Sequence, residues 1–235
     1  PLIFVDHINR RYSPNTPSPA SNDHFEQHQA STLTGVLTWQ PGGKYIELPE
    51  QKIGVGSKAP TLTLTFKKGI SNLLGSDIDY TKWSLNVSDD LPLGLGGTFQ
   101  YRATMGGFVN ANKLFAPDLQ HYFGNQAYVT IEHLKGFQLL PYYQFSNQSR
   151  FYSTVFAEYH LNGLLTNKIP GFRKLNWFLV GGVSYLHVNN MVDYTEAIIG
   201  IENIFKVMRV DLINGYQKGE PTRTGVRITV PIVFK

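Results

Sequence analysis

Apolar and polar residues alternate with a period of two along most of the chain. The clearest stretch is residues 91–107, which carries apolar side chains such as Phe99 on one face and polar or very small ones such as Gln100 on the other. Because successive side chains of a strand point to opposite faces, this alternation predicts β-strands. Strands are predicted at residues 33–40, 44–48, 60–68, 81–90, 91–107, 138–145, 151–162, 175–187, 196–204, 206–216 and 224–235.

These segments amount to about ten or eleven strands, and no segment has the period of a convincing amphipathic helix. The predicted fold class is therefore all-β. The first 30 residues include a stretch rich in Pro, Ser and Asn, which predicts an irregular loop, a linker or the remnant of a preceding strand. Residues 31–235 are predicted to form one β-domain.

Composition helps to decide which face of these strands meets water. Charged residues make up only 16% of the chain, and the polar strand faces carry mainly Thr, Ser, Gly, Asn and Gln. Soluble domains have about 25% charged residues, and their wet strand faces carry many of them. Strands of about 9–12 residues are also long enough for a tilted bilayer crossing. We therefore expect an antiparallel transmembrane β-barrel. The alternative is a soluble β-rich binding domain of the carbohydrate-binding type, with Tyr and Trp as stacking surfaces.

The barrel interpretation assigns two sets of side chains. One set is polar and is predicted to form a network facing the lumen: Thr98, Gln100, Arg102, Glu158, His160, Arg209, Asp211, Arg227 and Thr229. The other set is apolar and is predicted to face lipid: Phe99, Tyr101, Val210, Ile228 and Ile232. Glu158 and His160 share one strand face and could form an acid–base pair, but we favour a hydrogen-bonded network inside the lumen.

Other candidate chemistry is weakly supported. The chain has no cysteine, which excludes disulfides and thiolate metal sites. His24 and His28 have the spacing of a helical metal site, but they lack a third ligand and lie in a loop-like segment. Residues 94–97, Gly-Leu-Gly-Gly, are interpreted as part of a strand rather than a phosphate loop. No trustworthy Ser–His pair is present, so we expect no catalytic site, no metal and no cofactor.

Net charge also bears on partners. The formal charge of +4 is scattered along the sequence, whereas nucleic-acid binding needs a basic stripe or a known module. We therefore expect no nucleic-acid partner. The longest nearly apolar run, residues 177–186, is about half the length that a membrane-spanning helix needs.

One connection stands out for its cations. Residues 162–177 place Lys168, Arg173 and Lys174 around a Pro-Gly pair that should break a helix. We expect a basic turn that joins two membrane strands and carries apolar side chains beside its cations. A turn packed on the rim of a soluble barrel is the alternative. The apolar side chains are Leu164, Leu165, Ile169 and Phe172.

Several segments resemble the C-terminal region of the DUF5686 family. The resemblance rests on FYSTVFAEYHLNGLLTNKIPGFRKLNW (151–177), GIENIFKVMRVDL (200–212), GVGSKAPTLTLTFKKGI (54–70) and GNQ (124–126), which occur in the family's order. The family comprises outer-membrane proteins of Bacteroidota-type bacteria, usually with a carboxypeptidase-regulatory-like domain, and it is distantly similar to surface-antigen barrels.

The resemblance implies a location and partners. It implies a structural or transport-associated, non-enzymatic protein of the bacterial outer membrane that contacts lipid and lipopolysaccharide. The same resemblance implies that the basic turn is periplasmic, that Lys168, Arg173 and Lys174 reach lipid headgroups or an acidic surface of a partner, and that the apolar side chains of the turn dip into the membrane interface. It also implies other subunits of an assembly, secretion or export complex as partners. Because family members are longer, we expect this chain to be the C-terminal part of a larger barrel. The strand near Leu33 should then pair with residues upstream of Pro1, or with a segment outside the structure, rather than with the final strand at residues 224–234.

Overall fold

The computed structural model describes residues 1–11, 26–48, 50–57, 59–124, 129–130, 134–141 and 143–230. The strands in this part of the chain are β1 (Leu2–Arg10), β2 (His28–Trp39), β3 (Lys44–Leu48), β4 (Gln51–Gly56), β5 (Thr61–Gly69), β6 (Asp79–Pro92), β7 (Thr98–Lys113), β8 (Val129–Thr130), β9 (Tyr152–His160), β10 (Phe178–Val188), β11 (Tyr194–Ile204), β12 (Met208–Gln217) and β13 (Arg223–Thr229). One short α-helix occurs among the described residues, α1 (Pro170–Leu175), which lies in the connection between β9 and β10. None of the described helices is both long and apolar enough to cross a membrane.

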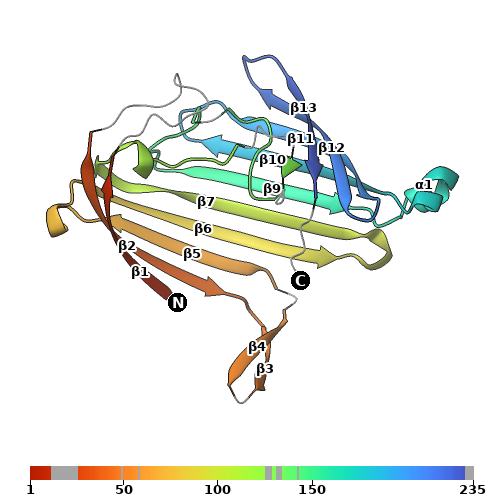
Figure 1. Ribbon diagram of the computed structural model, residues 1–235, viewed down its shortest axis with the longest axis horizontal. Helices are drawn as coiled ribbons and strands as arrows, with labels where there is room; N and C mark the ends of the chain where they lie inside the picture. Colours follow the sequence, from red (N-terminus) through yellow and green to blue (C-terminus); the bar gives the residue numbers. More distant parts are fainter. Residues whose placement is uncertain are drawn as a thin grey trace.

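Most strands belong to one antiparallel meander. The sheet order is β1-β2-β5-β6-β7-β9-β10-β11-β12-β13, and β8 adds a short parallel pairing to β13. Strands β3 and β4 form a separate hairpin that projects from this sheet (Figure 1). Within the described residues β1 pairs with β2 alone and not with β13, so the sheet is open rather than closed into a barrel.

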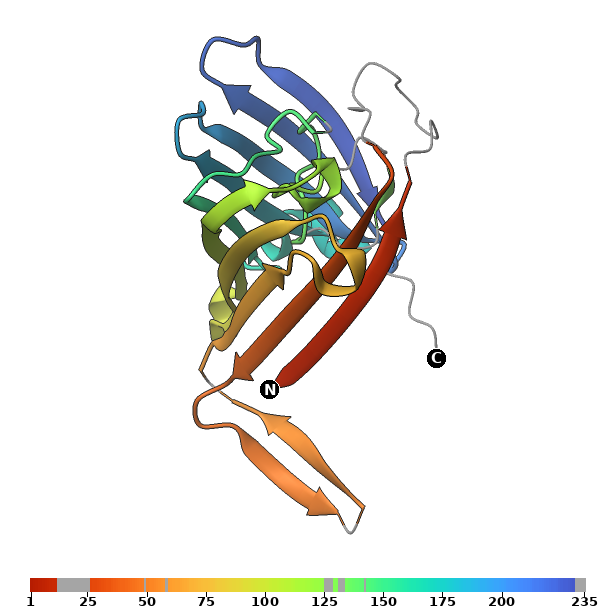
Figure 2. The same cartoon turned by 90° about the vertical axis from the view of Figure 1, so that its left-hand side faces the viewer.

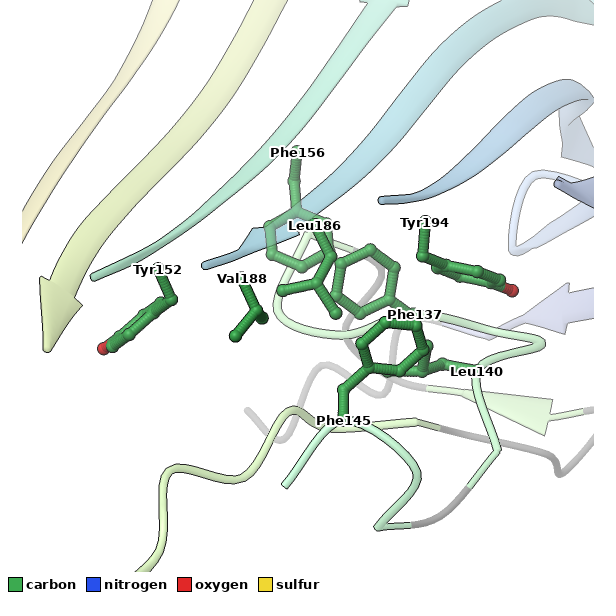
Figure 3. Packing of buried hydrophobic residues seen from close by; sticks show 8 residues of the cluster. All are labelled: Phe137, Leu140, Phe145, Tyr152, Phe156, Leu186, Val188 and Tyr194. Carbon is green, nitrogen blue, oxygen red and sulfur yellow. The ribbon is translucent and has the colours of Figure 1, made fainter. Parts of the chain in front are cut away.

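The sheet has an inner face and an outer face. Figure 2 shows that the sheet is strongly curved, and that the long connection between β7 and β9 lies on its concave side. We call the described part of residues 114–150 the inner segment, and the sheet face that it covers the inner face. Figure 3 shows Phe137, Leu140 and Phe145 of the inner segment packed against side chains of β9, β10 and β11. This cluster is the larger of the two buried apolar clusters in the described part of the chain.

The outer face is apolar and exposed. Its large exposed side chains include Ile199, which is 68% exposed, and Leu212, which is 49% exposed. These residues alternate along β11 and β12 with buried inner-face residues such as Ile198 and Ile213. Other exposed apolar side chains of the outer face are Leu33, Leu37, Leu64, Phe66, Met105, Val183, Tyr216 and Val226.

The all-β prediction is confirmed, and most predicted strands lie within a few residues of the observed ones. Strand β1 was not among the predicted strands, although a preceding strand was one of the alternatives for residues 1–30. Residues 2–10 form β1, and residues 12–25 lie outside the described part of the chain. The predicted pairing of the strand near Leu33 is also wrong. Leu33 pairs with Val5 of β1 rather than with residues upstream of Pro1. As expected, its strand does not pair with β13 within the described residues.

Two other strand predictions are wrong. Residues 91–107 do not form one strand, because β6 and β7 are joined through a short 3-10 turn at Gly94–Gly96. The turn uses the left-handed conformation at Gly94 and Gly97, where φ is +58° and +108°, and glycine adopts this conformation at the lowest cost. The strand predicted at 138–145 is absent, because the described residues of this stretch belong to the inner segment.

The Pro-Gly pair at 170–171 does not break a helix, contrary to the prediction. Pro170 occupies the first helical position of α1, where its missing N–H would have no partner in any case. The helix ends at Leu175, and Asn176 follows in the left-handed conformation with φ of 52°. A short helix therefore replaces the expected irregular turn between β9 and β10.

Candidate functional site

The centre of the inner face holds a buried ion pair between strands that are not neighbours. Glu158 lies on β9 and Arg209 on β12, and β10 and β11 separate them in the sheet. Nη1 and Nη2 of Arg209 donate to the two carboxylate oxygens of Glu158 at 2.6 and 3.0 Å. The exposed fraction is 1% for Glu158 and 5% for Arg209. Such a two-bond fork is among the stronger polar contacts in proteins.

Two further charges complete a four-residue ion network, which comprises Glu158, Arg209, Asp211 and Arg227. Asp211 accepts from Nε of Arg209 at 2.7 Å and from Nε of Arg227 at 2.8 Å. Nη2 of Arg227 lies 3.5 Å from Oε1 of Glu158. Two carboxylates and two guanidinium groups balance one another, which is what buried charges require. The network therefore braces β9 against β12 and β13.

Two glycines make room for the ion network. Gly182 of β10 is opposite Glu158, and Gly200 of β11 is opposite Asp211. A Cβ at Gly200 would lie 2.0 Å from Oδ1 of Asp211, and one at Gly182 would lie 3.0 Å from Cγ of Glu158. Strands β10 and β11 lie between the charges, and each has a glycine, without a side chain, at the position where a carboxylate crosses it.

His160 extends the polar contacts beyond the ion network. Its Nδ1 lies 2.8 Å from Oε2 of Glu202, and its Nε2 lies 3.1 Å from Oε1 of Gln100. Nε2 is also 3.6 Å from a carboxylate oxygen of Glu158. Together with the ion network, these contacts connect β7, β9, β11, β12 and β13 through side chains on one face.

A cavity of about 390 Å³ adjoins this cluster. It is lined by both charged and apolar side chains, and Oγ1 of the buried Thr229 has no hydrogen-bond partner in the described structure. The cavity could hold a small polar solute or water. The lining residues are His160, Asn162, Phe178, Glu202, Asn203, Lys206, Val207, Met208, Arg209 and Thr229.

Glu196 anchors the inner segment to the sheet. It is fully buried on β11, and its carboxylate accepts backbone N–H bonds from Gln138 at 2.8 Å and Leu139 at 2.6 Å. The hydroxyl of Tyr194 donates to the same carboxylate at 2.9 Å. The sequence did not single out Glu196, and its only signal was a charge on the inward face of a predicted strand.

A second anchor holds the start of the inner segment. Asp118, which is 1% exposed, accepts from Nη1 of Arg10 on β1 at 2.7 Å. His121 lies close by, with Nε2 2.8 Å from the carbonyl of Ala116 and Nδ1 2.8 Å from Oγ of Ser146. Burial lowers the pKa of His121, because desolvation disfavours its charged form.

The predicted polar network partly comes together. Four of its members form the ion network, Gln100 contacts His160, and Thr98 accepts from Asn162 at 3.2 Å. Arg102 lies on the same face of β7, and its buried Nε has no hydrogen-bond partner in the described part.

The predicted apolar set lies on the opposite, outer face, where the sheet alternation places it. This face carries Phe99, Tyr101, Val210 and Ile228, while Ile232 lies outside the described residues.

Of the candidate metal pair, the structure describes His28 alone. His28 stacks on Phe115 with ring centroids 3.7 Å apart, and His24 lies outside the described residues. No group of three or more metal-binding side chains occurs in the described ranges. His28 therefore contributes to the packing of the inner segment against β2.

Fold and site together define an all-β protein built from an open antiparallel sheet, with charges buried on its inner face and apolar side chains exposed on its outer face. The chain belongs to the DUF5686 family: the family model described as "Family of unknown function (DUF5686) C-terminal domain" matches residues 2–201. Comparisons with curated proteins and with solved structures found no match. The match includes Glu158, whereas β12 and β13 lie beyond its end.

Proposed function

We propose that this chain forms part of an integral β-barrel of a bacterial outer membrane, with a structural or transport-associated role and no catalytic activity. The observation that carries the proposal is the distribution of side chains over the two sheet faces. Exposed apolar residues such as Ile199 cover the outer face, and fully buried charges such as Asp211 lie on the inner one. A soluble sandwich has the opposite arrangement, with its apolar faces packed together.

A bilayer explains why an apolar outer face is tolerated. Outer-membrane barrels carry an apolar band toward lipid and a polar interior, and their strands alternate between the two. Large contiguous apolar patches are rare on soluble monomers. The long strands β6 and β7, of 14 and 16 residues, exceed the roughly 9–11 residues that a tilted crossing needs.

The open sheet edge supports a larger assembly. In lipid, each unsatisfied backbone group costs several kcal/mol, so spanning sheets close on themselves. The outward edge of β1 has no partner strand in the described structure. We therefore propose that further strands, in the same polypeptide or in a partner subunit of an assembly or export complex, complete the barrel.

Two matched substitutions test this function. Leu64→Lys places a charge on the outer face of β5, and Thr65→Lys places one on the inner face beside it. In a membrane barrel Leu64→Lys costs about 2–4 kcal/mol and reduces insertion, while Thr65→Lys is tolerated. In water neither change costs much, because Leu64 is already 43% exposed.

Membrane fractionation supplies the readout. Both the unmodified chain and Thr65→Lys should resist carbonate and urea extraction, and Leu64→Lys should fall to a fraction of their membrane-embedded level. Release of the unmodified chain as a monodisperse, detergent-free protein would contradict the proposal and favour a soluble carbohydrate-type binding domain.

A further inference from the structure

The connection between β9 and β10 gathers three cations around one hollow. This basic connection, residues 161–177, contains a 3-10 turn at Thr166–Lys168 followed by α1. A hollow of about 340 Å³ lies on it, and its lining consists of Lys168, Pro170, Arg173 and Lys174. Three of the four lining residues are therefore positively charged.

Local geometry explains why these side chains meet. Arg173 and Lys174 follow Pro170 by three and four residues, and residues with this spacing share one face of a helix. Lys168 ends the 3-10 turn just before α1. The backbone N–H of Trp177 donates to the carbonyl of Phe172 at 3.2 Å and closes the end of the helix.

No carboxylate of the described residues neutralises the three cations. In the described residues none of them takes part in an ion pair or a side-chain hydrogen bond, whereas Arg209 and Arg227 are each paired with buried carboxylates. All three are exposed. The hollow therefore has an uncompensated positive charge, which favours an anionic ligand.

Exposed apolar side chains flank the hollow. Leu164, Leu165, Ile169 and Leu175 are between 42% and 54% exposed. Phe205, in the adjacent turn between β11 and β12, is 81% exposed, and a hydrogen bond of 2.7 Å from Asn203 to the carbonyl of Asn176 ties this turn to the basic connection. Figure 1 shows α1 beyond the ends of the strands.

We propose that the basic connection binds the phosphate group of an anionic phospholipid. The three cations would contact the headgroup, and the flanking apolar side chains would enter the upper acyl region of the same leaflet. This inference rests on the proposed membrane function and adds a lipid-binding site to it. A cationic hollow beside an apolar flank matches the amphipathic profile of a phospholipid better than that of free phosphate.

Trp177 provides a local probe. Its ring lies 6.0 Å from that of Phe172 in α1, and the chain has three tryptophans in all. In a Trp39→Phe, Trp83→Phe background, Trp177 is the only tryptophan left. Its fluorescence would be measured in bilayers containing brominated phosphatidylglycerol or brominated phosphatidylcholine, whose bromine atoms quench tryptophan on contact.

The expected result is preferential quenching by brominated phosphatidylglycerol. Replacing Lys168, Arg173 and Lys174 together by Gln should remove this preference, at about fivefold in relative affinity for each cation, or about a hundredfold in total, at low ionic strength. The matched control replaces three cations near the opposite strand ends, by Lys113→Gln, Lys218→Gln and Arg223→Gln, and should keep the preference.

Three outcomes would overturn the inference. Equal quenching by both lipids would show that the hollow does not select an anionic phospholipid. An unchanged preference in the triple Gln variant would show that the three cations are not its source. Loss of the preference on addition of excess inorganic phosphate would assign the hollow to free phosphate instead of lipid.

A second pair of tryptophan substitutions distinguishes failure of the lipid-site proposal from failure of the proposed membrane function. With Trp83→Phe and Trp177→Phe, the remaining Trp39 lies on the outer face and is 60% exposed. Quenching of Trp39 without any lipid preference at Trp177 would refute the lipid site alone. Absence of Trp39 quenching by either lipid would refute the membrane location as well.

Discussion

Gly200→Ala should destabilise the protein by displacing a buried carboxylate. The added Cβ would lie 2.0 Å from Oδ1 of Asp211, so the carboxylate must move. That movement disrupts its bonds of 2.7 and 2.8 Å to Arg209 and Arg227. Loss of a partner from a buried ion pair costs about 3–5 kcal/mol, and alanine recovers about 0.4–1 kcal/mol by stiffening the unfolded chain. The difference between the two is a net loss of about 2–4.6 kcal/mol.

Two neighbouring glycines serve as graded controls. Nothing lies within 4 Å of a Cβ built on Gly181, so Gly181→Ala should change the free energy of unfolding by less than about 0.5 kcal/mol. A Cβ on Gly182 would lie 3.0 Å from Cγ of Glu158, a contact that a small shift can relieve, so Gly182→Ala should fall between the two.

Equilibrium urea unfolding in lipid vesicles, followed by tryptophan fluorescence, measures these differences. The slope with urea should be the same for all variants, since each changes one methyl group. A free energy of unfolding for Gly200→Ala that lies within about 0.5 kcal/mol of Gly181→Ala would show that the ion network does not depend on the space at Gly200, and would refute the reasoning.

Two further predictions concern the inner segment. Glu196→Gln replaces a carboxylate that accepts two backbone N–H bonds by an amide with one acceptor oxygen. The backbone amide of Gln138 should then exchange at least about tenfold faster with deuterium. The control Glu220→Gln, at an exposed position, should leave this exchange rate unchanged, and equal rates in both variants would contradict the role of Glu196 as an anchor. Burial lowers the pKa of His121 below its ordinary value of 6.5. As the pH falls, the unfolded chain therefore binds a proton at this residue before the folded chain does. The contribution of His121 to stability is complete above pH 6.5 and declines below it. His121→Gln should flatten the pH dependence of unfolding between about pH 5 and 7, and an unchanged profile would assign that dependence to other groups.

The strands could be predicted from sequence because their alternation is local. In β9, Glu158 and Phe156 share one face by spacing alone, and the structure places both on the inner face. The polar network was predicted for the same reason. Residue spacing could not predict that Glu158 of β9 reaches Arg209 of β12, three strand intervals away. That distance depends on the curvature of the sheet and on the lack of side chains at Gly182 and Gly200.

The inner segment and β1 could not be predicted in the same way. Phe137, Leu140 and Phe145 do not alternate, because they pack onto the sheet from a loop instead of forming a ladder. Glu196 had no recognisable role without that loop. Strand β1 begins with the apolar run Leu-Ile-Phe-Val, which lacks period-two alternation; its β-branched residues were the available signal.

Site-directed spin labelling of β6 tests the membrane orientation of the sheet most directly. The chain has no cysteine, so single cysteines at residues 83–88 report one site each. In vesicles, labels at Leu85 and Val87 on the outer face should collide more often with oxygen, which dissolves in lipid, than with a water-soluble nickel chelate. Labels at Ser84 and Asn86 on the inner face should not show this preference for oxygen. A period-two pattern with lipid contact at Leu85 and Val87 is the predicted result. Equal access of the nickel chelate to all six sites, or lipid contact at Ser84 and Asn86, would contradict the account.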